Sequence, residues 1–159
     1  METRFRPARP RSWLRIRKAR RAVVEEIQPG ALLPEFTLDI TRELLNAYCA
    51  ASGDHNPLHW DAEFAVTTQF EGIIAHGMLT LALISRMMTA AYGKSWLESG
   101  GLRTRFKGAA YLGDRVTSRG RVTKEEDKGD HRLLTCAVAV VNSESDEELV
   151  TGAATVKLR

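Results

Sequence analysis

Seven of the eight residues in the stretch SGDHNPLH, from Ser52 to His59, are polar or conformationally special, and only Leu58 is plainly apolar. Asp54 and His59 lie five positions apart in this stretch. A carboxylate and an imidazole that converge on one point can hold a water molecule between them and exchange protons with it. The pair is therefore a candidate for general acid–base catalysis.

The same stretch has a simpler structural interpretation. Asp54 and Asn56 can bond to their own backbone in an Asx-turn, which would explain both residues and Pro57 but not His59. In the catalytic interpretation, Asn56 orients its neighbours through its amide, and Pro57 stiffens the loop that positioned acid–base groups require. We assign Asp54, His59 and Asn56 to the catalytic site.

A second candidate is AHGML, residues 75–79, where a long apolar segment begins. The first N–H groups of a helix are unpaired and carry partial positive charge. Because glycine lets a substrate atom approach the backbone closely, the N–H of Gly77 can form an oxyanion hole. The alternatives are close packing of Gly77 against a strand and, for His76, a satisfied and partly buried histidine. We assign Gly77 to catalysis.

Ser85 and Arg86 are polar interruptions of this apolar segment. Ser85 can bond to the carbonyl four residues earlier or point toward a pocket, and Arg86 can reach solvent or an interface carboxylate. We assign Ser85, His76 and Met78 to substrate binding. The sequence contains no GxGxxG, P-loop or metal-ligand spacing, so we expect neither a nucleotide cofactor nor a metal.

The elements around the loop follow from periodicity and capping residues. Alternating apolar residues over 36–40 predict a short strand before it. Thr41 can cap a helix over 42–51, and Gly53 ends that helix. The loop therefore begins at a helix end.

After the loop, Asp61 begins a short helix, whose expected apolar contacts are Phe64, Ala65 and Phe70. From Met78 to Tyr92 the chain is apolar nearly all round, with Gly93 as its C-terminal cap. This segment is shorter than the ~20 residues that a bilayer needs, so we expect protein to wrap it.

The last third of the chain supplies the wrapping. Its β-rich segments, separated by hairpin-type breaks, cover 101–113, 114–127, 131–143 and 148–159. Long antiparallel strands after one buried helix predict a single α+β domain, in which a curved antiparallel sheet folds around a long central helix.

Charge divides the chain into two parts. Residues 1–21 hold nine Arg or Lys and one acid, which leaves 14 basic and 19 acidic residues in the rest of the 159. We therefore separate a basic N-terminal extension, 1–27, from a folded domain, 28–159. We expect the extension to be solvated or loosely docked, and its composition also suits an anionic surface or a mitochondrial transit peptide.

The two cysteines, Cys49 and Cys136, have no CxxC or metal-ligand spacing. We expect them to be buried thiols in a reducing compartment. The composition predicts a cytoplasmic protein without membrane insertion or nucleic-acid binding, with a mitochondrial location as the alternative if the extension is a transit peptide.

The stretch from Tyr48 to Leu79, YCAASGDHNPLHWDAEFAVTTQFEGIIAHGML, resembles the hydratase motif of the MaoC-like dehydratases. This family includes (R)-specific enoyl-CoA hydratases. The loop, the spacer and the start of the long helix agree together, and the similarity extends over residues 35–159. The basic extension lies outside it.

The resemblance implies a hot-dog fold, in which an antiparallel sheet wraps a long helix. It implies that Asp54 and His59 are the acid–base pair and that Asn56 is its supporting amide. It also implies that the Gly77 N–H polarises a thioester carbonyl and that Ser85 lies near the pair.

The activity implied by the resemblance is that of a hydro-lyase. The enzyme would hydrate trans-2-enoyl thioesters to (R)-3-hydroxyacyl thioesters, or catalyse the reverse dehydration. The substrate would be a thioester of coenzyme A or acyl carrier protein, with no separate cofactor. Because family members pair into dimers with a continuous sheet, we expect a homodimer or a heterodimer with a related subunit.

Two other functions stay open. A hot-dog thioesterase would cleave the thioester instead, but such enzymes usually bring an acid from the central helix, and no Asp or Glu lies between Met78 and Tyr92. The other is a non-catalytic hot-dog partner subunit, directed by the arginine-rich extension.

Overall fold

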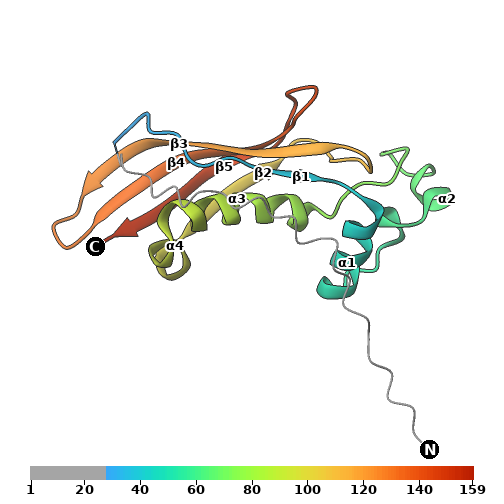
Figure 1. The fold of residues 1–159 in the computed structure, drawn as a ribbon, viewed down its shortest axis with the longest axis horizontal. Coiled ribbons are helices and arrows are strands. Elements are labelled where there is room, and N and C mark those ends of the chain that lie inside the picture. The colour runs from blue at the N-terminus through green and yellow to red at the C-terminus, as the bar shows by residue number, and fades with distance from the viewer. Residues whose placement is uncertain (1–27) are drawn as a thin grey trace, which may run out of the picture.

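The structure is a computed structural model that describes residues 28–159 (Figure 1). The basic extension predicted for residues 1–27 lies outside the described residues. The elements, in chain order, are β1 (Phe36–Asp39), α1 (Arg42–Ser52), the 3₁₀ helix η1 (Pro57–His59), α2 (Ala62–Ala65), α3 (Gly77–Tyr92), α4 (Lys94–Ser99), β2 (Gly101–Phe106), β3 (Arg115–Asp127), β4 (Arg132–Asn142) and β5 (Glu148–Leu158). All the helices therefore lie between the first strand and the other four.

The strands form one antiparallel sheet in the order β1-β3-β4-β5-β2. Figure 1 shows this sheet curving over α3, which lies along one of its faces. The short strands β1 and β2 are the two edges, and the long strands β3, β4 and β5 form the centre. The predicted arrangement of a long helix under a curved antiparallel sheet is confirmed.

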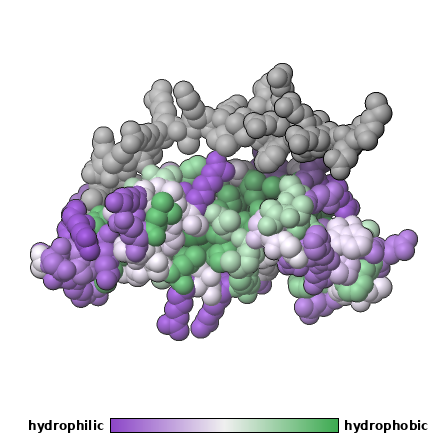
Figure 2. All heavy atoms as spheres, turned by 90° about the horizontal axis from the view of Figure 1, so that it is seen from below, coloured by the Kyte–Doolittle hydropathy of each residue, from purple (hydrophilic) through white to green (hydrophobic). Residues whose placement is uncertain are grey.

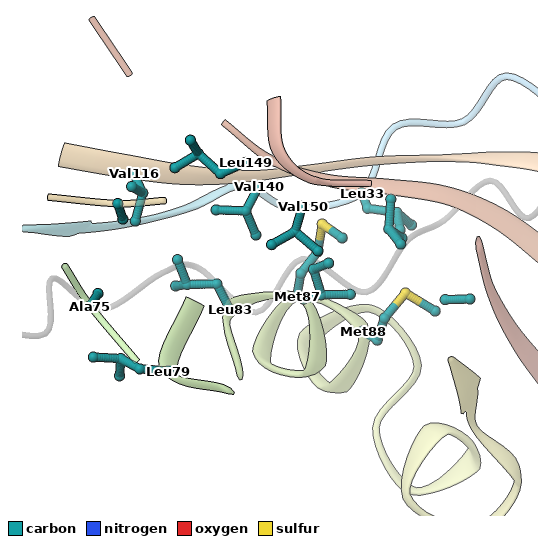
Figure 3. Close-up of a cluster of buried hydrophobic side chains, with 14 of the residues drawn as sticks. Leu33, Ala75, Leu79, Leu83, Met87, Met88, Val116, Val140, Leu149 and Val150 are labelled. Atoms are coloured by element: carbon teal, nitrogen blue, oxygen red, sulfur yellow. The ribbon is translucent and has the colours of Figure 1, made fainter. Parts of the chain in front are cut away.

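The core lies between α3 and the sheet. Figure 3 shows Leu83 and Met87 pointing from α3 toward Val116, Val140 and Val150 of the strands. Each of these side chains is at most 3% exposed. Full burial of one such side chain stabilises the folded state by about 1.5–3 kcal/mol. This packing fixes the helix against the sheet, and with it the position of the helix N-terminus.

Within the described residues, the long helix is covered by the sheet on one side and is partly exposed on the other. Met78 is 60% exposed, Ala82 is exposed, and the guanidinium of Arg86 lies 4.4 Å from the centre of the Phe36 ring. Figure 2 views the molecule from the helix side and shows hydrophobic residues gathered over the middle of this face, between hydrophilic ends. The described residues therefore leave one apolar face of α3 open.

The first helix begins and ends where the sequence predicted. Oγ1 of Thr41 accepts a hydrogen bond from the Leu44 N–H at 3.2 Å. Gly53 donates its N–H to the Cys49 carbonyl at 3.0 Å and has a φ of 75°, a left-handed conformation that favours glycine. This turn directs the chain away from the helix axis into the loop that carries Asp54.

The short helix α2 is capped as predicted, but one of its predicted contacts is wrong. Oδ1 of Asp61 accepts hydrogen bonds from the N–H groups of Glu63 and Phe64. Ala65 is fully buried, whereas Phe64 is 43% exposed. Adjacent residues on a helix point in different directions, so a single turn that buries Ala65 leaves Phe64 in solvent.

Two boundaries differ from the prediction. The strand predicted over 101–113 ends at Phe106, and the chain after it borders a cavity. The helix α4 was not predicted, because only Trp96 among its six residues is buried, which is too few to form an apolar pattern. Within residues 28–159, no helix combines the length and the hydropathy that a membrane span requires.

Gly152 of β5 and Gly120 of β3 offer a matched test of the packing. A Cβ at Gly152 would run into the carbonyl of Arg103, whereas a Cβ at Gly120 would meet only the flexible ends of Leu33 and Met87. We expect Gly152→Ala to lower the free energy of unfolding by about 3 kcal/mol and Gly120→Ala by about 1 kcal/mol. Urea denaturation measures both, and equal losses would contradict the close approach of β5 to β2.

Candidate active site

The loop after α1 and the start of α3 bring three titratable side chains together. A carboxylate oxygen of Asp54 and one ring nitrogen each of His59 and His76 lie within 4.8 Å of one another. The imidazoles are buried, with 7% and 2% exposure, and Asp54 is exposed. The predicted acid–base residues therefore converge, and the second histidine joins them.

A short extended segment, residues 73–75, positions the first imidazole. On one side it pairs with residues 110–112 through backbone hydrogen bonds of 2.7 and 3.0 Å. Because alternate backbone groups of an extended chain point to opposite sides, the Ile74 carbonyl faces the other way. It lies 2.8 Å from Nδ1 of His59. A main-chain group thus orients this side chain.

That hydrogen bond determines the tautomer of His59. A carbonyl oxygen only accepts, so Nδ1 carries the proton and donates it to Ile74. In the neutral ring Nε2 is left with the lone pair, which makes it the ring atom able to take a proton from a bound molecule. His59 is therefore held as a base.

The carboxylate is oriented by its own loop. Oδ1 of Asp54 accepts the Asn56 N–H at 3.2 Å, and Oδ1 of Asn56 accepts the Leu58 N–H at 3.0 Å. These are the turn contacts of the simpler interpretation, and they coexist with the convergence on His59. Each carboxylate oxygen accepts more than one hydrogen bond, so the turn leaves Asp54 free to bind a water molecule. Asn56 supports the loop by capping η1.

A cavity of about 700 Å³ joins His59 to Gly77 at the start of α3. Asp54 approaches the imidazole from the exposed loop and does not line the cavity. The N–H of the first helical residue has no intrahelical acceptor and is available to a ligand. A base and a free N–H donor thus share one cavity, whose walls also include Phe70, Ile74, Phe106 and Tyr111.

The structure places Gly77 where both interpretations require it to lie. It lines the cavity, and a Cβ added to it would lie 3.2 Å from the Phe106 ring of β2. Close packing and access for a substrate atom therefore demand the same absence of a side chain.

The predicted substrate-binding residues do not line this cavity. His76 is buried, with its ring stacked on His59 at 3.8 Å between centroids. Met78 points out from the open face of α3. Oγ of Ser85 accepts a hydrogen bond from Nε1 of Trp96 at 3.2 Å, two turns along the helix. In this chain the structure gives no contact between Ser85 or Met78 and the candidate site.

Sequence reasoning missed two contributors. Thr80 lines the cavity one turn after Gly77, and its Oγ1 donates to the Gly77 carbonyl at 2.7 Å. A polar residue in an apolar helix, three positions after a candidate oxyanion glycine, was a usable signal. The Ile74 carbonyl left no signal in the sequence, because every residue type has the same backbone carbonyl.

The electrostatics keep the second imidazole neutral. Burial is the largest influence on the pKa of His76 and lowers it; the hydrogen bond to the Asp54 carbonyl raises the pKa, and the nearby His59 lowers it. The three side chains have the donor types that metals use. However, ring-nitrogen lone pairs lie in the ring planes, and these planes are only 26° apart, so the lone pairs do not converge on one ion. The cluster suits proton transfer better.

Comparison with known proteins gives the family. The family model of the MaoC like domain matches residues 27–146. Over 114 residues the chain is 40% identical to the (R)-specific enoyl-CoA hydratase of Aeromonas caviae, which covers 70% of this chain and 81% of that protein.

Comparison with solved structures gives the same family. R-hydratase PhaJ1 from Pseudomonas aeruginosa matches with a TM-score of 0.69 and 32% identity, over 82% of this chain and 81% of that one. A chain of the ChsH1-ChsH2 complex from Mycobacterium tuberculosis matches with a TM-score of 0.69 and 25% identity, over 83% of this chain and 98% of that one. The expected hot-dog fold is thus the fold observed. The chain belongs to the MaoC-like domain family.

Proposed function

We propose that this protein is a hydro-lyase that adds water to trans-2-enoyl thioesters to give (R)-3-hydroxyacyl thioesters, and that catalyses the reverse dehydration. One observation carries the proposal: a single cavity joins the base His59 to the N-terminus of α3 at Gly77, with the Asp54 carboxylate beside the imidazole. The stereochemistry follows the activity named for the Aeromonas caviae relative. The thioester of coenzyme A or acyl carrier protein is the substrate, and no separate cofactor takes part.

Asp54 and His59 hold the attacking water. Their facing atoms lie within 4.8 Å of each other, and a hydrogen bond to water is about 2.8 Å long. One water molecule can therefore donate to both acceptors at once. The β-carbon is the site of attack, because conjugation with the thioester carbonyl makes it electrophilic.

The neutral tautomer of His59 supports one order of proton transfers. The predicted division, in which Asp54 removes the water proton and His59 delivers another, would require a proton on Nε2 before the reaction. In the neutral ring, whose Nδ1 donates to Ile74, Nε2 holds a lone pair instead. His59 takes the water proton as the hydroxide adds to the β-carbon, and then returns that proton to the α-carbon. Asp54 orients the water and stabilises the imidazolium, so one water is consumed and no proton is left over.

Gly77 stabilises the negative charge that moves onto the thioester oxygen. Its N–H begins α3, a helix of 16 residues whose N-terminus carries partial positive charge. Loss of one oxyanion donor costs about 3–4 kcal/mol of transition-state stabilisation in enzymes where this has been measured. The thioesterase alternative gains no support, since Gly77–Tyr92 contributes no carboxylate to the cavity.

Asp54→Asn and His59→Asn test the pair while keeping the loop intact. Asn at position 54 retains an oxygen for the Asn56 N–H, and Asn at position 59 retains an N–H near the place from which Nδ1 donates to Ile74. Asn at position 59 cannot take the water proton, and Asn at position 54 carries no charge to stabilise the imidazolium. We expect kcat for hydration of a trans-2-enoyl-CoA to fall by ~10²–10⁴-fold in each, followed by the loss of the conjugated absorbance.

The control is Glu63→Gln, which removes an exposed acid from the neighbouring helix α2. It should leave kcat unchanged. Rates near wild type in both Asn variants would refute the mechanism, and release of thiol from a saturated acyl-CoA would favour the thioesterase.

We also infer that two copies pair through β2. This strand is an edge of the described sheet, and it exposes Leu102 and Phe106 by 36% and 53%. An unpaired edge with exposed apolar side chains favours pairing with another strand. Two antiparallel copies of β2 would continue the sheet across a two-fold axis and bring the apolar residues together. A matching solved chain is itself part of a two-protein complex.

Leu102→Lys tests the pairing, because a charge on an edge strand opposes edge-to-edge association. Leu97→Lys is the control: Leu97 is 72% exposed but lies on the helix α4 and not on the edge strand. Sedimentation velocity at micromolar concentration should show dimers for the wild type and for Leu97→Lys, and monomers for Leu102→Lys. A monomeric wild type would refute the inference.

A further inference from the structure

The peptide carbonyl of Asp54 is held by donors from two different elements. Sγ of Cys49, on α1, donates to it at 3.0 Å. Nε2 of His76, at the start of α3, lies 3.2 Å from the same oxygen. Two donors occupy both lone pairs of a carbonyl oxygen. The backbone of Asp54 is therefore tied to two helices, although its carboxylate is exposed.

The second donor belongs to a side chain that also touches the base. The rings of His76 and His59 are stacked, with 3.8 Å between centroids and 26° between planes. On another side, the ring of His76 lies 4.8 Å from that of Tyr48. The Ile74 hydrogen bond sets the rotation of the His59 ring, and the stack covers one of its faces. Together these contacts leave the base one orientation.

We propose that His76 is a positioning residue that clamps the acid to the base: it binds the backbone of Asp54 through Nε2 and the ring of His59 through its face. The inference rests on the function proposed above and deepens it. His76 does not line the cavity. Its role is to set the separation across which one water is held.

The clamp requires one tautomer of His76. Since the Asp54 carbonyl can only accept, Nε2 carries the proton and Nδ1 holds the lone pair. Nδ1 is buried, and no hydrogen-bond partner for it exists in the described part of the chain. A proton there would add a buried charge with no acceptor, so the ring stays neutral while His59 changes its charge during the reaction.

An orphaned ring nitrogen is costly, and the clamp explains why it is kept. An unpaired buried polar atom destabilises the folded state, because it loses its hydrogen bonds to water on folding. A hydrocarbon side chain at position 76 would remove that cost but would also remove the donor to Asp54. The structure retains the imidazole because its other nitrogen and its face are both in use.

His76→Gln and His76→Asn form a matched pair of variants. The amide nitrogen of Gln reaches about as far as Nε2, whereas that of Asn reaches only to the position of Nδ1. His76→Gln therefore keeps the bond to Asp54, and His76→Asn loses it. We expect kcat to fall by about 10²-fold in His76→Asn with KM unchanged. His76→Gln should retain about tenfold more activity than His76→Asn.

Equal rates in the two variants, or a His76→Asn rate equal to wild type, would overturn the clamp. A rise in KM with unchanged kcat would also overturn it and would return His76 to substrate binding. Circular dichroism of both variants verifies that each is folded before the rates are compared.

Nitrogen-15 NMR of the histidine rings tests the clamp without reference to activity. At neutral pH, the ring of His76 should carry a proton on Nε2 and none on Nδ1. A proton on Nδ1 at neutral pH would overturn the proposal. A wild type that hydrates no enoyl thioester would refute the proposed function, and the NMR result would still show whether the clamp exists.

The pH dependence of stability tests in a second way whether buried His76 is neutral. Burial lowers the pKa of His76 in the fold, while the unfolded chain has the usual value of about 6.5. The groups that face the ring are His59, Asp54 and Tyr48. The unfolded state binds the proton more readily than the folded state. The contribution of neutral His76 to the free energy of unfolding is therefore complete above the unfolded pKa and is lost as pH falls below it. Between pH 7 and 5, Tm should fall more in wild type than in His76→Gln; parallel curves would contradict a neutral, buried His76.

Discussion

The backbone hydrogen bonds of residues 73–75 hold the candidate site together. On one side the segment pairs with residues 110–112, and on the other the Ile74 carbonyl orients His59. The chain then continues directly into the stacked imidazole of His76 and the helix N-terminus at Gly77. The base, its ring partner and the oxyanion donor are thus placed relative to a single peptide segment. The packing of α3 against the sheet keeps that segment in place.

Much of the fold was predictable, because several of the contacts that begin and end its helices join residues close together in the sequence. Thr41 and Asp61 accept hydrogen bonds from the first turns of their helices, and Gly53 adopts the left-handed conformation that ends α1. The central strands alternate between buried and partly exposed residues, as in β4, so their period of two is legible in the sequence. The convergence of Asp54 and His59 was predictable as well, both from their residue types and from the resemblance to the family.

The differences between the predicted and the observed contacts have a common cause: the type of a residue does not determine which way its side chain points. Met78 follows Gly77 directly, yet a rotation of about 100° per helical residue turns it away from the cavity. Ser85 bonds to Trp96, which comes from a helix that no pattern predicted. Phe64 lies beside the buried Ala65 and faces solvent. Tertiary packing decides each of these cases, and packing depends on partners distant in the sequence.

Ile74 contributes to the site through two independent parts. The residue borders the cavity, while its main-chain oxygen accepts the hydrogen bond from Nδ1 of His59. Every amino acid offers the same main-chain oxygen, so a different side chain here would reshape the space for the acyl group without changing how the base is held. Selectivity among acyl groups and the chemistry of proton exchange are therefore free to diverge during evolution, even where one residue serves both.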